Sequence, residues 1–234
     1  MGVLKSFLRR FFLTLTILSL VSGQSAVQAA PYRRAATEEK RIALTFDDGP
    51  NEKKTREILG VLAEYDVKAT FFVIGENAEA HPDRIREIYD AGHEIGNHTW
   101  SHGNLTRLGR DRIREEVRKT EEVLMRICGE KPAVFRPPGG CWSESSIAVV
   151  EEMGYTCVLW SVDTRDWTMP GADSVIRRVA GKTRGGDIVL FHDLGDEKLP
   201  TPDALRVLLP QLREEGYEFV TVSELLGANG EAVS

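Results

Sequence analysis

Residues 41–49 read Arg-Ile-Ala-Leu-Thr-Phe-Asp-Asp-Gly, a short apolar run that ends in two aspartates and a glycine. Runs of roughly four to eight apolar and β-branched residues with turn residues after them are typical of buried strands. A helical pattern follows at 55–65, where Ile58, Leu59 and Leu62 fall on one face. One strand followed by one helix is the unit from which parallel sheets are built.

The rest of the chain repeats this alternation. Further strands are predicted at 69–74, 93–97, 134–136, 157–162, 187–191 and 218–222, and helices at 81–91, 111–128, 145–153, 174–180 and 204–215. Strands that alternate with helices in this way indicate an α/β protein with a parallel sheet. An open doubly wound sheet and a barrel both satisfy the pattern.

The composition excludes several classes of protein. The chain has 234 residues, 41% of them hydrophobic, and a formal net charge of −6. Disordered, collagen-like and multi-spanning membrane proteins have a different balance of apolar and charged residues. The acidic charge argues against nucleic acid as a partner, because nucleic-acid binders carry basic surfaces. Three cysteines are too few for a disulfide scaffold.

The N-terminus has the pattern of a secretory signal peptide, predicted at 1–29. Lys5, Arg9 and Arg10 precede an apolar run, and small residues end at Ala29. Cleavage after Ala29 removes three basic and no acidic side chains, so the net charge changes from −6 to −9. An uncleaved membrane anchor is the alternative, although a spanning helix needs roughly 20 apolar residues. We therefore expect an exported protein that contacts the membrane only through this segment, if it stays uncleaved.

The mature chain is expected to hold a single domain. Residues 30–40 show no apolar periodicity and are predicted to form a tether, and residues 227–234 a flexible tail. No internal repeat divides residues 41–226. We expect this domain to be a monomer.

Polar and potentially reactive side chains follow five of the predicted strands. These groups are Asp47-Asp48-Gly49, His98 to His102, Arg136 to Gly140, Asp163 to Trp167 and His192-Asp193. The carboxyl ends of parallel strands meet at one edge, where ligands and catalytic groups gather in barrels and doubly wound sheets alike. This convergence predicts an enzyme.

The histidine pair indicates a metal site. His98 and His102 are four residues apart, so on one helical turn both rings would project from the same face. Two imidazoles and a carboxylate with an open fourth position form a catalytic zinc-type site. Either Asp47 or Asp48 is able to supply the carboxylate, which leaves the other free to act as a base. The alternative is that these histidines and aspartates cap a turn and the next helix.

Three further groups have chemistry suited to such a site. Arg136 stands before two prolines that stiffen its loop, and its guanidinium would orient a carboxylate such as Asp47. His192 follows a buried apolar run, where Asp166 would tune it as a general acid. The glycine pair at 139–140 would let a backbone N–H approach a substrate, as an oxyanion donor must.

These segments, in this order, resemble the motifs of the polysaccharide deacetylase family, also called the NodB homology domain or carbohydrate esterase family four. The five motifs are Thr45-Phe-Asp-Asp-Gly49, His98-Thr-Trp-Ser-His102, Arg136-Pro-Pro-Gly-Gly140, Asp163-Thr-Arg-Asp-Trp167 and Leu190-Phe-His192. The resemblance implies a single-domain α/β fold of the distorted (β/α)7 barrel type. It also implies metal-dependent removal of N-acetyl, or in some members O-acetyl, groups from a glycan.

The resemblance assigns the metal ligands and the base. Asp48, His98 and His102 would bind one divalent metal, with zinc expected first and cobalt, manganese or nickel as alternatives. Asp47 would deprotonate the attacking water, and Arg136 would hold Asp47.

The remaining roles also come from the resemblance. His192 would protonate the leaving amine, with Asp166 tuning it. The oxyanion donor of the family is a backbone N–H that falls on Gly139, a position where the family often carries tyrosine. Leu190 and Trp167 would line a pocket for the acetyl methyl group.

The exchange of tyrosine for glycine at 139 keeps the backbone N–H but removes a side-chain wall of the cleft. We expect Cys141 and Trp142, just beyond it, to fill that space. Substrate subsites are therefore affected more than the chemistry.

The sequence thus predicts a metal-dependent de-N-acetylase that acts on a GlcNAc-containing polysaccharide, with cell-wall peptidoglycan as the expected substrate and a secreted or wall-associated location. The alternatives are a chitooligosaccharide or O-acetyl-xylan deacetylase, and a catalytically silent carbohydrate-binding protein of the same fold. A glycosidase with two catalytic carboxylates would explain neither the histidine pair nor Arg136.

Overall fold

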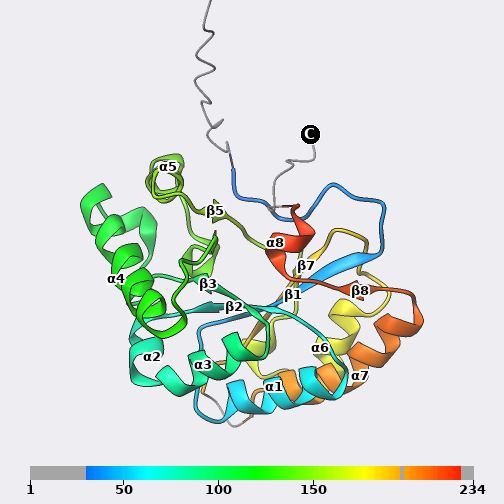
Figure 1. The fold of residues 1–234 in the computed structure, drawn as a ribbon. Coiled ribbons are helices and arrows are strands. Elements are labelled where there is room, and N and C mark those ends of the chain that lie inside the picture. The colour runs from blue at the N-terminus through cyan, green and yellow to red at the C-terminus, as the bar shows by residue number, and fades with distance from the viewer. Residues whose placement is uncertain (1–29, 196–197, 228–234) are drawn as a thin grey trace, which may run out of the picture.

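The computed structural model describes residues 30–195 and 198–227, and within them eight strands alternate with helices (Figure 1). The strands are β1 (Arg41–Asp47), β2 (Thr70–Val73), β3 (Glu94–Asn97), β4 (Val134–Phe135), β5 (Thr156–Cys157), β6 (Val162–Asp163), β7 (Ile188–His192) and β8 (Glu218–Phe219). The α-helices are α1 (Lys54–Glu64), α2 (Gly75–Ala80), α3 (Pro82–Asp90), α4 (Arg110–Cys128), α5 (Glu144–Glu152), α6 (Ala172–Val179), α7 (Thr201–Glu214) and α8 (Val222–Leu225). The signal peptide predicted at 1–29 and residues 228–234 of the tail predicted at 227–234 lie outside the described residues.

The sheet is parallel and curls into a distorted barrel. Its strand order is β5-β4-β3-β2-β1-β7-β6, and β8 pairs with the start of β1. The two edge strands, β5 and β6, are consecutive in the chain and are joined by residues 158–161 alone. Four residues span at most about 14 Å, so the two edges of the sheet lie close together. The predicted single-domain (β/α)7-type barrel is confirmed.

One face of β1 packs in the hydrophobic core, and the other face carries polar side chains into the barrel interior. Successive side chains of a strand point to opposite faces, and Ile42, Leu44 and Phe46 face the helices in the main hydrophobic core. Thr45 and Asp47 are buried too, and they alternate with those three and so face the barrel interior. The strand therefore places its polar side chains on the inner surface.

The helices form a layer outside the sheet. Helices α1, α3, α6 and α7 lie along its outer side, and α4 lies beside α2 and α5 (Figure 1). The long α4 buries Ile113, Val117 and Leu124 at helical spacing. It ends at Gly129, whose φ of 81° is the left-handed conformation that commonly terminates a helix.

The segment predicted as a tether, residues 30–40, lies against the barrel. The Tyr32 N–H donates to Cys157 O at 2.9 Å, and its carbonyl accepts from the Leu159 N–H. Farther along, the Ala35 N–H donates to Gly186 O at 2.8 Å. These backbone hydrogen bonds join the segment to the edge strand β5, to Leu159 just after it and to Gly186 just before β7, and such bonds leave no apolar periodicity in the sequence. The segment is part of the domain rather than a free tether.

Two other predicted elements differ from the structure. The strand expected at 157–162 is two short strands, because Val158 and Leu159 turn to pair with Tyr32 while the chain crosses from one sheet edge to the other. The strand expected at 218–222 stops at Phe219, since Thr221 caps the short helix α8. Helices α2 and α8 were not predicted, because neither is long enough to show a helical repeat.

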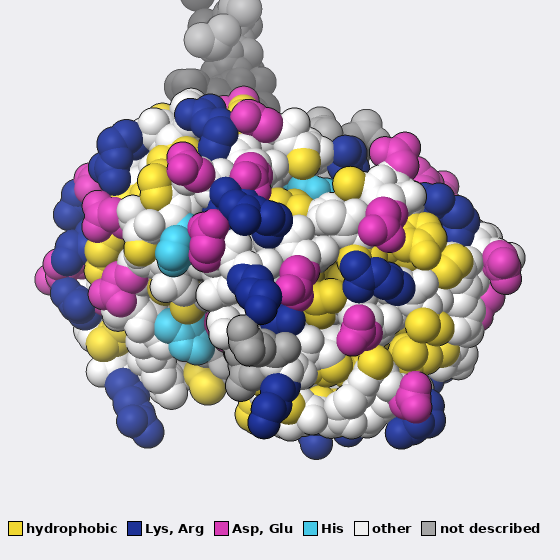
Figure 2. Space-filling model, turned by 90° about the horizontal axis from the view of Figure 1, so that it is seen from below, with side chains coloured by type: hydrophobic (Ala, Val, Ile, Leu, Met, Phe, Trp, Pro, Cys, Tyr) yellow, Lys and Arg dark blue, Asp and Glu magenta, His cyan; other side chains and the backbone are white. Residues whose placement is uncertain are grey.

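The described residues contain neither a disulfide nor a helix suited to cross a membrane, and charges of both signs are mixed on the face shown in Figure 2. The cysteines, Cys128, Cys141 and Cys157, form no disulfide within the described residues. Over the same part of the chain, no helix has the length and apolar character needed to cross a membrane. Figure 2 shows acidic and basic side chains interspersed on the face that it presents.

We expect Phe46→Ala to lower the free energy of unfolding by about 3–5 kcal/mol. The Phe46 ring stacks on Phe71, with centroids 4.9 Å apart, and on Phe191 at 5.7 Å, so truncation leaves a cavity in the main core. Urea denaturation measures the change. Val207→Ala is the control, because Val207 is 48% exposed and its truncation should cost little. Equal losses in the two variants would contradict the assignment of this core.

Candidate active site

A cavity at the carboxyl edge of the sheet collects eight of the ten site residues predicted from the sequence. It is lined by Asp47, Asp48, His98, His102, Gly139, Trp160, Asp163, Trp167, Leu190, His192 and Leu194. The other two, Arg136 and Asp166, are fully buried behind this lining. The predicted residues thus come together in one place.

Strand register accounts for much of this convergence. β1 and β7 are parallel neighbours in which Asp47 is paired with His192 and Thr45 with Leu190. Paired residues on neighbouring strands point to the same face, so Asp47 and His192 both face the barrel interior. β3 and β4 pair through Asn97 and Phe135, which places the next residue of each chain segment at the same edge.

The backbone at Asp48 makes both consecutive aspartates usable. Adjacent side chains of an extended strand point in opposite directions, yet Asp47 Oδ2 and Asp48 Oδ1 lie 3.7 and 3.5 Å from the same atom, His98 Nε2. Asp48 has a φ of 77°, in the left-handed region that non-glycine residues seldom adopt. This reversal at the end of β1 turns the second carboxylate back into the cavity.

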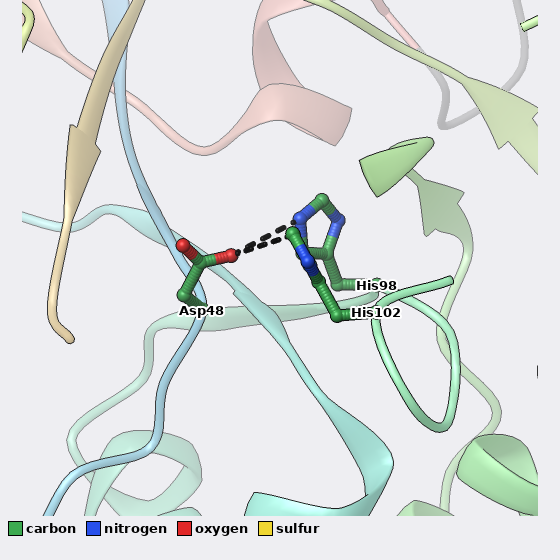
Figure 3. A group of neighbouring side chains, drawn as sticks. All are labelled: Asp48, His98 and His102. Carbon is green, nitrogen blue, oxygen red and sulfur yellow. Dashed lines mark ion pairs between the residues drawn. The ribbon is translucent and has the colours of Figure 1, made fainter. Parts of the chain in front are cut away.

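Asp48, His98 and His102 form a cluster whose ligand atoms all lie within 4.8 Å of one another (Figure 3). Asp48 Oδ1 is 3.0 Å from His102 Nε2, and the two imidazole centroids are 5.0 Å apart. Figure 3 shows both rings turned toward the Asp48 carboxylate. Two nitrogens and one oxygen with an open side are the donor set of a catalytic zinc-type site.

The state of His98 supports this reading. Its Nδ1 lies 2.7 Å from the Arg136 carbonyl oxygen, and a carbonyl only accepts, so Nδ1 carries the proton. In the neutral ring that a metal ligand requires, Nε2 then has the lone pair, and among the described residues it is buried with no hydrogen-bond partner. A second ring nitrogen fixed to a backbone carbonyl is the usual support of a metal-binding histidine. The cluster fits a divalent cation.

The same cluster perturbs two pKa values. Burial alone would raise the pKa of Asp48, but the contacts with His102 and His98 outweigh burial and hold it well below its usual range. The Asp48 carboxylate in turn raises the pKa of His102, against the effect of burial. Asp48 is thus ionised at neutral pH, as a metal ligand must be.

The histidines meet through a loop rather than on a helical turn. Residues 98–102 contain no helix, and both Thr99 and His102 have positive φ, at 69° and 57°. The loop is anchored at Ser101, whose N–H donates to the buried Glu116 carboxylate at 2.8 Å. The i, i+4 spacing therefore predicted the correct pair of histidines, but their rings meet because of the loop conformation and not because of a helical turn.

Arg136 holds Asp47 inside the barrel. Its Nη1 donates to Asp47 Oδ1 at 2.7 Å and to Thr45 Oγ1 at 2.8 Å, and Nη2 donates to Leu159 O at 2.8 Å. The guanidinium lies 4.1 Å from the centroid of Phe72. Burial lowers the pKa of Arg136 and the Asp47 charge opposes that shift, but a guanidinium stays protonated in proteins.

His192 and Asp166 form a second fixed pair. His192 Nδ1 lies 2.7 Å from Asp166 Oδ1, and the His192 N–H donates to Asp166 Oδ2 at 2.8 Å. The Trp167 N–H and the Thr201 hydroxyl also donate to this carboxylate. Burial lowers the pKa of His192, but Asp166, together with the charges of Asp47 and Asp48, outweighs burial and raises the pKa to about 9. His192 therefore carries a proton at neutral pH.

Of the two residues expected to fill the space beside Gly139, only Cys141 lies there, with its Sγ 3.9 Å from where a Cβ on Gly139 would be, and Trp160 packs on the neighbouring Gly140. A Cβ on Gly140 would lie 2.8 Å from the Trp160 ring, so the indole packs directly on that glycine. Trp142 packs against the third core cluster instead, while Cys141 is exposed with its Sγ 3.7 Å from Gly139 O. Trp160 lies in the segment predicted as continuous strand, which concealed its role as a wall of the cavity.

Leu194 and Asp193 were also not assigned from the sequence. Leu194 lines the cavity just after β7. Asp193 is fully buried beside it, and burial raises its pKa to about 7, with the charges of Asp48 and Asp47 adding to the shift. The position of Asp193 directly after His192 was the only signal available in the sequence.

Comparison with known proteins gives consistent matches. A family model described as polysaccharide deacetylase matches residues 34–158. A peptidoglycan-N-acetylglucosamine deacetylase of Bacillus cereus is 39% identical over 217 residues, which cover 92% of this chain and 77% of the relative. A chitooligosaccharide deacetylase of Rhizobium leguminosarum bv. trifolii is 36% identical, covering 82% of this chain and 95% of the relative. The crystal structure of the Bc1960 peptidoglycan N-acetylglucosamine deacetylase, in complex with 4-naphthalen-1-yl-N-oxidanyl-benzamide, superposes with a TM-score of 0.81 and 39% identity over 83% of this chain and 91% of that chain.

We expect the metal-stripped protein to bind one divalent cation per chain, and His98→Ala to weaken that binding by more than about 100-fold. Loss of a direct ligand should exceed the roughly 10–100-fold cost of losing a supporting group. Titration calorimetry with zinc measures both values. His81→Ala is the control, because His81 lies at the α2–α3 junction and does not line the cavity. Equal binding by wild type and His98→Ala would contradict the site.

Proposed function

Because the chain belongs to the polysaccharide deacetylase family and is a carbohydrate deacetylase, we propose that it removes N-acetyl groups from N-acetylglucosamine units of cell-wall peptidoglycan. One observation carries this proposal: a candidate metal cluster, a carboxylate fixed by arginine and a protonated histidine line the same cavity. Amide hydrolysis needs an activated water, a stabilised oxyanion and a proton for the departing nitrogen. The cavity supplies a candidate for each.

Asp47 is proposed as the general base. Its Oδ1 is engaged by Arg136, which leaves Oδ2 facing the cluster at 3.7 Å from His98 Nε2. A carboxylate held in this way keeps one oxygen available to take a proton from the attacking water. Arg136 positions the base and maintains its charge in a buried setting.

His192 is proposed as the general acid. Asp166 accepts from Nδ1 and so directs Nε2 toward the cavity, where it is able to donate to the leaving nitrogen as the C–N bond breaks. The products are acetate and a free amine on the sugar. The raised pKa of His192 keeps the proton in place until transfer.

Gly139 is proposed to stabilise the oxyanion through its backbone. Gly140 and Cys141 donate their N–H groups to Pro137 and Pro138 carbonyls at 2.9 and 3.1 Å. Gly139, which has a φ of 59°, lies in the chain between Pro138 and Gly140 and lines the cavity. Its N–H is the donor best placed to meet a developing negative charge there.

A divalent metal held by Asp48, His98 and His102 would polarise the acetyl carbonyl and make water more acidic. We propose zinc as that metal, with cobalt, manganese or nickel as alternatives, since imidazole and carboxylate ligands accept several divalent ions.

The substrate enters against apolar walls. Leu190 lies on the inner face of β7, and Trp167 is 52% exposed at the rim of the cavity. We propose that these two side chains receive the acetyl methyl group. A Cβ on Gly139 would meet only Cys141 Sγ, at 3.9 Å, so the cleft is open beside this glycine, which suits a polymeric glycan rather than a small isolated sugar.

We further propose that the protein is exported by residues 1–29 and acts outside the cytoplasm, where peptidoglycan lies. The basic residues, the apolar run and the small residues ending at Ala29 support this proposal.

Purified protein loaded with zinc should release acetate from peptidoglycan, and Asp47→Asn should lower kcat by at least about 100-fold, because a general base typically contributes that much. Mass spectrometry of the glycan should show loss of one acetyl group per event with no change in chain length. Asp111→Asn, a fully exposed position, is the matched control. Chitooligosaccharides and acetylated xylan complete the panel, and faster release from either would replace peptidoglycan as the substrate.

The alkaline limb of kcat/KM should fall near pH 9 and should move to lower pH in Asp166→Asn. An acid must carry its proton, so activity is present below the pKa of His192 and is lost as pH rises through it. Removing Asp166 removes the main contribution that raises this pKa, while burial still lowers it. Asp173→Asn, exposed in the first turn of α6, should keep the wild-type limb. An unchanged limb in Asp166→Asn would exclude His192 as the acid.

A further inference from the structure

Asp193 is a buried carboxylate that the mechanism above leaves unused. It follows β7 directly, is 0% exposed, and its N–H donates to Asp47 O at 3.1 Å. A Cβ placed on Gly49 would lie 2.1 and 2.3 Å from the two Asp193 carboxylate oxygens. The carboxylate therefore occupies the space that a side chain at 49 would need, and it packs directly on the Gly49 backbone.

Asp193 also reaches the start of α1. The Thr55 hydroxyl donates to Asp193 Oδ2 at 2.5 Å and accepts from the Asn51 N–H at 2.8 Å. The hydroxyl has one proton, so the direction of both bonds is fixed. Asp193 thus contacts the turn that follows β1 directly at Gly49 and, through Thr55, at Asn51.

The opposite side of the turn is held as well. Asn77 Nδ2 donates to Asp48 O at 2.8 Å, and the Ile74 N–H donates to Gly49 O at 2.9 Å. Two carbonyls of the turn are therefore held by Asn77 and Ile74, while the Asn51 N–H is held by Thr55, whose hydroxyl donates to Asp193. Asp193 is the only ionisable side chain among these partners.

The turn needs such support because Asp48 is strained. A non-glycine residue in the left-handed region persists only where its surroundings over-determine it. Relaxation of φ to a negative value would swing the Asp48 carboxylate away from His98 and His102. Asp47 would stay in place, because it lies on β1 and is held by Arg136.

We propose that Asp193 is a positioning residue for the metal ligand Asp48, acting through Thr55 and through its packing on Gly49 to hold the strained turn. This inference rests on the proposed metal site. It links the first and last polar clusters of the sequence through one carboxylate, which fills the space that a side chain at Gly49 would need and accepts from Thr55 at the start of α1.

Asp193→Asn tests the proposal with little change in shape. An amide has one acceptor oxygen where a carboxylate has two, so the NH₂ group either replaces the acceptor of the Thr55 hydroxyl or is placed against Gly49. We expect the dissociation constant for zinc, measured by titration calorimetry on metal-stripped protein, to rise about 10–100-fold. The visible spectrum of the cobalt-loaded variant should also change, because the carboxylate ligand is displaced.

Asp187→Asn is the matched control, because Asp187 is 1% exposed and lies at the other end of the same strand, β7. It accepts from Arg34 and Ser161, away from the cavity. This variant should lose stability and keep wild-type zinc affinity. Zinc affinity within about 2-fold of wild type in Asp193→Asn would overturn the proposal, whatever its melting temperature.

Thr55 provides a second test if Asp193→Asn fails to fold. Thr55→Val removes the hydroxyl that joins Asp193 to the turn and should weaken zinc binding, whereas Thr55→Ser keeps the hydroxyl and should restore it. Equal affinity in the valine and serine variants would overturn the proposal. If wild-type protein itself binds no zinc, the proposed metal site fails, which is a distinct result.

Discussion

The buried guanidinium of Arg136 joins the two halves of the cavity. From β4 it reaches across the barrel interior to Asp47 and Thr45 on β1, although β2 and β3 lie between these strands in the sheet. Its own carbonyl accepts from His98 Nδ1, so the same residue fixes the base candidate and one histidine of the cluster. Removing two charges from water offsets much of their attraction, and we infer that the pair serves chiefly to fix position.

A second constraint acts at the end of β1, where the consecutive residues Asp47 and Asp48 have different roles. The strand directs Asp47 inward toward Arg136, and the positive φ of Asp48 returns the next carboxylate to the same cavity. The two neighbouring carboxylates have different partners. Asp47 pairs with the Arg136 guanidinium, whereas Asp48 faces the imidazoles of His98 and His102. The strained turn at Asp48 is held from outside, and Asp193 contributes to that support through Thr55.

Much of the fold follows from local pattern. The alternation of apolar runs with helical stretches is strong at β1, β7, α4 and α7, and these elements lie within a residue or two of their predicted positions, apart from the first turn of α7. The predictions of secondary structure fail where a segment is held by backbone hydrogen bonds and not by the packing of periodically spaced apolar side chains. Residues 30–40 pack through main-chain hydrogen bonds, and residues 158–161 cross between sheet edges, so neither segment shows a periodicity that a sequence reveals.

The sequence by itself determined which residues meet. In a parallel sheet every strand ends at the same edge, so polar clusters after five strands had to converge, and eight of the ten predicted residues line one cavity. Only the tertiary structure decided what each residue faces. Which aspartate meets Arg136 depends on strand parity and on one positive φ, and the tautomer of His98 depends on a carbonyl 38 positions away. Trp160 became a wall because Gly140 offers it a surface without a side chain. These outcomes depend on contacts between distant segments, which spacing along a chain does not encode.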